Sequence, residues 1–182
     1  IFFGRLIIEK GILEYIEAAK IIKKKYPDVN FFIAGPTDQG VIGQSKFSIS
    51  TLNIINENKK YVKYMGYIEN YKKVFPKMDC LVSPSFSEGA GTSVMEAMLS
   101  GLFVVAYNNS GHKYVLNETP NKLVKYNNVN NLVKNIEKFI KLNNDQIKKF
   151  KTISYNKITS KFSSNVISYK FKEILDREYK II

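Results

Sequence analysis

Two acidic side chains stand on either side of a glycine-rich turn near the middle of the chain. Glu88 comes directly before the turn at 89–91, and Glu96 follows it, with seven residues between the two glutamates. A helix capped by Thr92 or Ser93 is expected to begin where the turn ends. Free N–H groups and the helix dipole bind anions there, so a diphosphate would fit. Because carboxylate oxygens accept hydrogen bonds, Glu88 and Glu96 suit hydroxyl groups beside that diphosphate.

Two basic side chains follow the first apolar run of the chain. Arg5 offers a planar fork for phosphate oxygens, and Lys10 offers a compact point charge. Ligands of open parallel sheets bind beyond the carboxyl ends of the strands. We therefore expect both cations to face the same ligand as the glycine-rich turn.

The elements that must position these residues alternate along the chain. Short apolar runs rich in Val, Ile, Phe and Tyr predict strands at 1–3, 29–34, 61–65, 80–82, 103–106 and 122–124. Amphipathic segments predict helices at 12–26, 45–58, 71–77, 92–100, 111–117 and 130–142.

This alternation predicts the α/β class. We expect a Rossmann-like, doubly wound parallel sheet of about six strands, with helices on both faces. Two closing helices are expected at 145–160 and 164–179. The segment 35–43 contains Pro36 and three glycines and predicts a mobile loop.

Composition limits the class of protein further. The 182 residues fit one domain, and 28 basic against 16 acidic residues give a formal net charge of +12, which favours anionic partners. The single cysteine, Cys80, excludes an internal disulfide and suits a reducing cytosol. The chain has no apolar run of the roughly 18 residues that span a bilayer, and we expect no signal peptide at its start. It starts at Ile1 inside an apolar run, so we expect it to be part of a longer protein.

The one histidine, His112, is expected to be a solvated loop residue without a catalytic role.

Several segments together resemble a known family. They are Gly4-Arg5-Leu6, Glu9-Lys10-Gly11, Lys25-Tyr26-Pro27-Asp28-Val29, Phe32-Ile33-Ala34-Gly35, Met65-Gly66-Tyr67, Met78-Asp79-Cys80-Leu81-Val82-Ser83-Pro84-Ser85, Ser87-Glu88-Gly89, Glu96-Ala97-Met98-Leu99-Ser100-Gly101, Val104-Val105-Ala106 and Ser110-Gly111. Over residues 1–142 the chain resembles the C-terminal, donor-binding domain of GT-B glycosyltransferases of the large retaining family 4, in particular bacterial O-antigen and capsule enzymes.

The resemblance implies a role for each matching residue. Arg5 and Lys10 would bind the donor diphosphate and stabilise the leaving group, Glu88 would face the donor sugar, and Glu96 would bind the ribose. Arg5, Lys10 and Glu88 are thus the candidate catalytic residues. The other implied donor-binding residues are Gly4, Gly35, the base-binding loop Gly66, Tyr67 and Ile68, and the phosphate cradle Gly89, Ala90, Gly91, Thr92 and Ser93.

The resemblance also implies an activity. The whole of 1–182 would be one nucleotide-sugar-binding domain of an enzyme that moves a hexosyl or N-acetylhexosaminyl group with retention. The donor would be a nucleotide diphosphate sugar; a UDP-sugar such as UDP-GalNAc is the expectation. The acceptor, a saccharide or lipid-linked sugar of surface polysaccharide synthesis, would bind an N-terminal domain absent from this chain, so the chain alone is expected to be inactive. No metal or other cofactor is expected, because the sequence has no Asp-x-Asp motif and no His/Cys cluster.

The basic surface has two interpretations. It would either seat a cytoplasmic enzyme on the anionic inner face of the plasma membrane, or serve solubility alone. Three other functions stay open: a nucleotide-sugar epimerase of the same fold, a glycoside hydrolase with Glu88 and Glu96 as its carboxylate pair, and a basic nucleic-acid-binding module. Nucleic acid is not an expected partner, because the aromatic residues fall in buried-strand patterns rather than on an exposed sheet.

Overall fold

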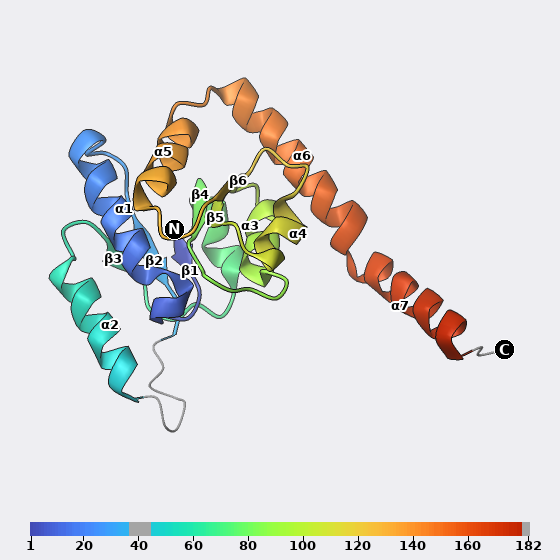
Figure 1. Cartoon of the computed structure of the whole chain (residues 1–182). Helices are drawn as coiled ribbons and strands as arrows, with labels where there is room; N and C mark the ends of the chain where they lie inside the picture. The colour runs from blue at the N-terminus through green and yellow to red at the C-terminus, as the bar shows by residue number, and fades with distance from the viewer. Residues whose placement is uncertain (37–44, 180–182) are drawn as a thin grey trace.

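Six short parallel strands form the centre of the computed structural model, which describes residues 1–36 and 45–179 (Figure 1). One sheet has the order β1 (Phe2–Phe3), β2 (Phe32–Ala34), β3 (Lys63–Tyr64). The other has the order β4 (Cys80–Ser83), β5 (Phe103–Tyr107), β6 (Lys122–Val124). The α/β class and the predicted strand number are confirmed. Most of the predicted loop at 35–43 lies outside the described residues.

The two sheets meet along β1 and β4. The N-terminal nitrogen of Ile1 donates to the Cys80 carbonyl at 2.7 Å, and the Val82 N–H donates to the Ile1 carbonyl at 2.9 Å. The spatial order is therefore β3-β2-β1-β4-β5-β6. The chain reverses its direction of winding between β1 and β4, which is where doubly wound sheets bind their ligands.

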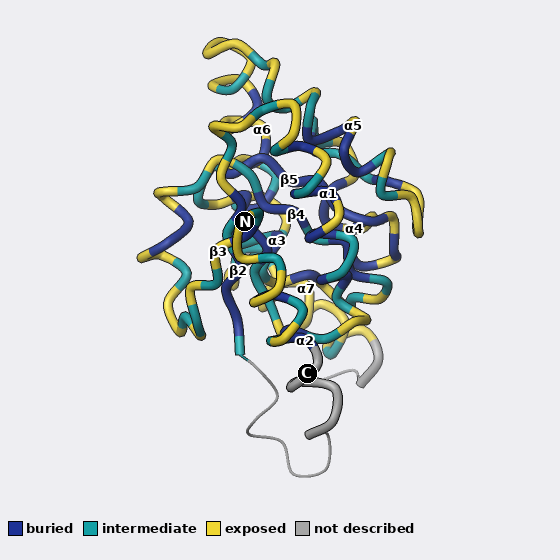
Figure 2. The backbone as a smooth tube through the Cα atoms, turned by 90° about the vertical axis from the view of Figure 1, so that its left-hand side faces the viewer, coloured by how far each residue is buried: buried dark blue, intermediate teal, exposed yellow. Residues whose placement is uncertain are grey.

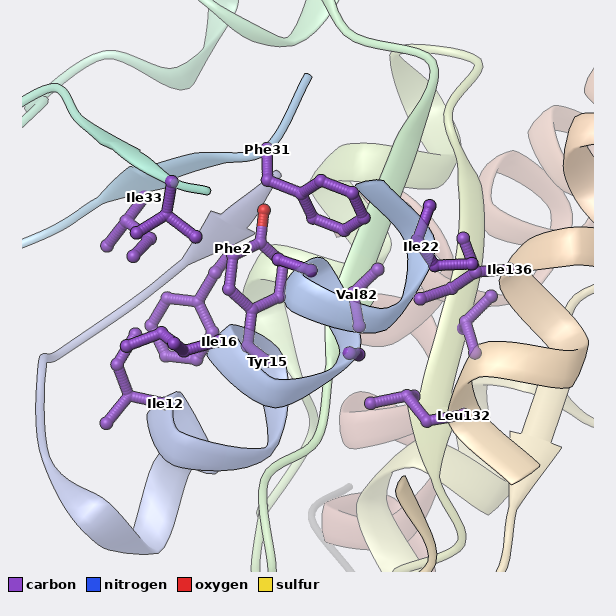
Figure 3. Packing of buried hydrophobic residues seen from close by; sticks show 14 of the residues in the cluster. Phe2, Ile12, Tyr15, Ile16, Ile22, Phe31, Ile33, Val82, Leu132 and Ile136 are labelled. Carbon is purple, nitrogen blue, oxygen red and sulfur yellow. The ribbon is translucent and has the colours of Figure 1, made fainter. Parts of the chain in front are cut away.

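Helices cover both faces of the strands. One face carries α1 (Ile12–Lys25), α2 (Ser45–Glu57) and α5 (Val129–Ile140), and the other carries α3 (Thr92–Leu99) and α4 (Ser110–Leu116). Helix α6 (Asn144–Phe162) contributes to both cores, with Phe150 in the first and Ile158 in the second. Strand residues alternate between the two cores: Val105 packs with α1 and α5, whereas Val104 packs with α3 and α4. Figure 3 shows the first core, where Ile22 of α1 lies beside Ile136 of α5.

Exposure follows the same layering. The buried stretches lie in the strands and along the inner sides of the helices, while the yellow, exposed stretches lie at the periphery (Figure 2). All five residues of β5 are buried, as expected for a central strand covered on both faces.

The segment 71–77 differs from the prediction. It forms two 3-10 turns, Tyr71–Lys73 and Phe75–Lys77, instead of one α-helix. Pro76 lies within the second turn. Proline has no N–H to donate, and its ring clashes with the carbonyl four residues earlier, so a continuous α-helix is broken here.

The C-terminal helices agree closely with the prediction. Helix α6 begins after a capping box in which Asn143 and Gln146 bond each other's backbone, and it ends at Phe162. Helix α7 (Ser164–Tyr179) then extends away from the strands (Figure 1). None of the helices within 1–36 and 45–179 combines the length and apolar character of a membrane span.

Candidate active site

A cavity of about 440 Å³ opens at the carboxyl ends of β1 and β4, the switch point of the fold. Its wall combines the end of β1, the end of β4 and the first turn of α3. The lining residues are Phe2, Phe3, Gly4, Arg5, Lys10, Val82, Ser83, Ser85, Glu88, Thr92, Ser93 and Glu96. The cavity therefore brings all three predicted catalytic residues together, along with four of the predicted donor-binding residues, Gly4, Thr92, Ser93 and Glu96.

The remaining predicted residues are not among those that line this cavity. Gly35 lies directly behind Gly4, and its N–H donates to the Gly66 carbonyl at 3.0 Å. Tyr67 is 66% exposed, and Ile68 packs against the core beneath α3. In the predicted phosphate cradle, Gly89 and Ala90 are exposed and Gly91 is buried.

A larger cavity, of about 570 Å³, lies at the opposite, amino-terminal edge of the strands. Phe31, Phe139 and Ile140 are among its mainly apolar lining residues. Ligands of this topology bind at the carboxyl edge, and the basic side chains Arg5 and Lys10 converge there. We therefore take the smaller cavity as the candidate site, because of its position at the carboxyl edge and its basic side chains rather than its volume.

An ion pair crosses the candidate site. Lys10 Nζ lies 2.7 Å from Glu88 Oε1, and each side chain keeps about a fifth of its surface exposed, 21% and 19%. From the resemblance, Lys10 was expected to contact phosphate and Glu88 to contact the sugar, as two separate contacts. The pairing joins the two roles, because the lysine that would meet the leaving group also orients the carboxylate that would meet the sugar.

Close packing of two loops produces this pair. Phe86 N–H donates to the Glu9 carbonyl at 3.0 Å, which ties the loop after β4 to the loop after β1. Gly11 faces the Pro84 backbone so closely that a Cβ at position 11 would collide with the Pro84 carbonyl. Only glycine permits this approach, and it places Lys10 opposite Glu88.

Helix α3 starts differently from the expectation. Its N-cap is Gly91, in the left-handed conformation (φ 60°, ψ 56°), and no side chain caps it, so the predicted cap at Thr92 or Ser93 is wrong. Thr92 and Ser93 instead belong to the first turn and line the cavity. An N-terminus without a side-chain cap leaves its N–H groups available to an anion.

His112 also differs from the expectation. It is fully buried at the start of α4, behind the candidate site, rather than solvated in a loop. Its Nε2 lies 3.2 Å from Ser83 Oγ, and its Nδ1 lies 2.8 Å from the Tyr107 carbonyl. The expectation failed because Asn109, the N-cap of α4, turns the chain inward directly after β5.

Comparison with known proteins identifies the family. Residues 1–157 match the family model of glycosyl transferases group 1. The chain belongs to this family. The resemblance to the C-terminal domain of GT-B glycosyltransferases, stated from the motifs, is thereby confirmed.

Individual relatives agree with the family assignment. The chain is 23% identical over 181 residues to the N,N'-diacetylbacillosaminyl-diphospho-undecaprenol alpha-1,3-N-acetylgalactosaminyltransferase of Campylobacter jejuni, covering 99% of this chain and 45% of the relative. It is similar to a Staphylococcus aureus TarM variant crystallised with fondaparinux, alpha-GlcNAc-glycerol and UDP (TM-score 0.79, 25% identity), covering 94% of this chain and 34% of TarM. The chain thus spans less than half the length of these two glycosyltransferases.

A third similarity concerns a separate domain. The crystallised C-terminal domain of a glycosyl transferase group 1 protein from Francisella tularensis superposes with a TM-score of 0.70 at 24% identity, covering 90% of this chain and 85% of that one. The doubly wound architecture of this chain therefore matches a domain that has been crystallised without the rest of its protein.

Glu96 gives the candidate site a testable pH dependence. Burial raises the pKa of the Glu96 carboxyl above its ordinary value. If the carboxylate accepts ribose hydroxyls, binding of a UDP-sugar must weaken as the pH falls through this raised pKa, at higher pH than for an ordinary glutamate near about 4.3. We expect Glu96→Gln to bind more weakly at neutral pH and to lose part of the pH dependence, measured by calorimetry between about pH 7 and pH 5. An identical pH profile in the variant would contradict the assignment.

Sequence reasoning missed two residues of the site. Ser83 and Ser85 line the cavity, and the Ser85 hydroxyl donates to the Ser87 carbonyl at 3.0 Å. A positional signal was available, because Ser83 is the last residue of β4 and so lies at the carboxyl edge of the sheet. Its partner His112 could not be found from the same signal.

Proposed function

We propose that this chain is the donor-binding domain of a retaining glycosyltransferase that transfers a hexosyl or N-acetylhexosaminyl group from a UDP-sugar. The observation that carries the proposal is the composition of the switch-point cavity. Two cations and a helix N-terminus meet two carboxylates in one space of about 440 Å³. Phosphate needs the first set and sugar hydroxyls need the second, and a nucleotide sugar supplies both.

The cations would assist departure of the nucleotide. When the bond between the anomeric carbon and the diphosphate breaks, the electron pair leaves with the diphosphate oxygen and negative charge grows there. Arg5, Lys10 and the N-terminus of α3, which line the same cavity, would stabilise that charge. Because these groups supply positive charge without a metal, a metal-independent reaction remains our prediction.

UDP-N-acetylgalactosamine is the donor that we propose. The name of the Campylobacter jejuni relative describes transfer of N-acetylgalactosamine, and the TarM complex contains UDP. The acceptor would be a saccharide or a lipid-linked sugar of bacterial surface polysaccharide synthesis, bound by an N-terminal domain. The relative's name, which includes a diphospho-undecaprenol acceptor, supports this choice.

A location follows from the same proposal. A lipid-linked acceptor would bring the enzyme to the cytoplasmic face of the plasma membrane. The formal net charge of +12 would favour peripheral contact with an anionic surface. Nucleic acid is not part of the proposed set of partners.

Titration calorimetry tests the proposed donor class. We expect the chain to bind UDP with a Kd of about 1 mM or tighter, and to prefer UDP over GDP and ADP. UDP-sugars tested next should bind at least as tightly as UDP, since they add contacts to Glu88. If none of the three nucleotides binds at millimolar concentration, the proposal is wrong. A preference for GDP or ADP would agree with the proposed binding cavity but would show that the base of the donor is not uracil.

A further inference from the structure

A buried chain of polar groups leads from the candidate site into the core. Ser83 lines the cavity, and its Oγ lies 3.2 Å from His112 Nε2. On the other side of the ring, Nδ1 lies 2.8 Å from the Tyr107 carbonyl and 3.0 Å from Asn109 Nδ2. His112 and Asn109 are both buried, so their hydrogen-bonding choices are fixed by the protein rather than by water.

The partners determine where the histidine carries its proton. A carbonyl oxygen can only accept, so the 2.8 Å contact with Tyr107 requires a hydrogen on Nδ1. Asn109 does not compete for that position. Its Oδ1 accepts from the His112 N–H at 2.8 Å, which turns its Nδ2 toward the Ser85 carbonyl at 3.0 Å.

The second ring nitrogen then has no hydrogen. Burial disfavours the charged imidazolium and lowers the pKa of His112, with the nearby charges of Glu88 and Lys10 acting in opposite directions. A neutral ring with hydrogen on Nδ1 leaves Nε2 as an acceptor. The Ser83 hydroxyl must therefore donate its only hydrogen to Nε2, away from the ligand.

This arrangement fixes what Ser83 can offer to the cavity. With its hydrogen engaged, the hydroxyl oxygen presents only lone pairs, so it accepts hydrogen bonds and cannot donate them. A phosphate oxygen placed against it would set acceptor against acceptor. A ligand hydroxyl would donate to it directly. The cavity wall near β4 is therefore suited to a hydroxyl and unsuited to the diphosphate.

We propose that Ser83, held as an acceptor by His112, is a specificity-determining residue that binds a hydroxyl group of the donor, and that His112 is its positioning residue. This inference rests on the proposed function, because it takes the ligand to be a nucleotide sugar. It also divides the cavity. The diphosphate is confined to the side of Arg5 and Lys10, and a hydroxyl-bearing part of the donor lies against Ser83.

The test compares three variants by calorimetry with UDP and with the UDP-sugar that binds the parent chain most tightly. Ser83→Ala removes the acceptor and should weaken binding about threefold to tenfold. His112→Asn keeps an amide donor for the Tyr107 carbonyl but cannot reach Ser83, so the serine hydroxyl is released. It should weaken binding less than Ser83→Ala does. In the double variant, His112→Asn should add nothing, because the two residues act through one bond.

The two ligands distinguish the source of the hydroxyl. Weaker binding of both UDP and the UDP-sugar would place a ribose hydroxyl on Ser83, and weaker binding of the UDP-sugar alone would place a sugar hydroxyl there; either supports the inference. Unchanged binding in Ser83→Ala would overturn it. The inference would also be overturned if His112→Asn weakened binding equally with and without the Ser83 hydroxyl. That result would indicate a structural role of His112 that is independent of Ser83.

Two controls keep the result interpretable. Ser160→Ala changes an exposed serine on α6, remote from the cavity lining, and should bind like the parent. Melting temperatures within a few degrees of the parent confirm that the variants fold. If the parent chain binds neither ligand, the proposed function itself fails, and this outcome is distinct from failure of the Ser83 inference alone.

Discussion

Replacing Arg5 with alanine should slow sugar transfer a hundredfold or more in an enzyme that joins this domain to its acceptor domain. Arg5 lines the cavity, and no carboxylate among residues 1–36 and 51–177 forms a salt bridge with it. Its charge is thus available to the departing diphosphate. Losing one such contact raises the barrier by about 2.7–4 kcal/mol, by analogy with oxyanion-hole donors. The measurement is kcat with saturating donor and acceptor.

Two further variants interpret that result. Arg5→Lys keeps the charge but loses the planar fork, so an intermediate rate is expected. Lys125→Ala removes an exposed cation that lies outside the cavity lining, and it should transfer sugar at the parent rate. A near-normal rate for Arg5→Ala would remove this residue from the mechanism.

Replacing Gly111 with alanine should disrupt the site from behind. A Cβ at position 111 would lie 2.5 Å from the Glu88 carbonyl oxygen and 2.9 Å from its carbonyl carbon. These are backbone atoms, so the loop that carries Glu88 would have to move. We expect the free energy of unfolding to fall by about 1–3 kcal/mol, as for other overpacked sites, and nucleotide binding to weaken about tenfold or more. Urea unfolding and calorimetry measure the two effects.

Gly89 provides the matched control in the same loop. A Cβ at position 89 would meet no atom within 4 Å. Gly89→Ala should therefore change the free energy of unfolding by no more than about 0.5 kcal/mol. If Gly111→Ala were as stable as Gly89→Ala, the close contact between α4 and the Glu88 loop would not require glycine at position 111.

The order of elements could be predicted because it depends on local pattern. Apolar runs such as that at β5 specify buried strands, and their alternation with amphipathic segments specifies a parallel sheet. The predicted strands at 29–34 and 61–65 are longer than the observed β2 and β3. Apolar side chains continue beyond the paired backbone there, and periodicity does not distinguish pairing from simple burial.

The site was predictable only in part. Arg5, Glu88 and Glu96 follow from the rule that ligands lie at the carboxyl ends of strands. The Lys10–Glu88 pair joins residues 78 positions apart, and it depends on contacts between two loops that no local pattern specifies. The burial of His112 is likewise a tertiary property, set by how α4 packs behind the loop that carries Glu88.

The most direct test of the donor-binding account is to map UDP on the chain by backbone amide NMR. The account predicts that titration with UDP shifts the amide signals of Arg5, Thr92, Ser93 and Glu96, which surround the switch-point cavity. Signals at the opposite edge, such as those of Asn30 and Phe139, should stay in place. Shifts confined to that opposite edge, or no shifts at millimolar UDP, would contradict the claim that this cavity binds the donor.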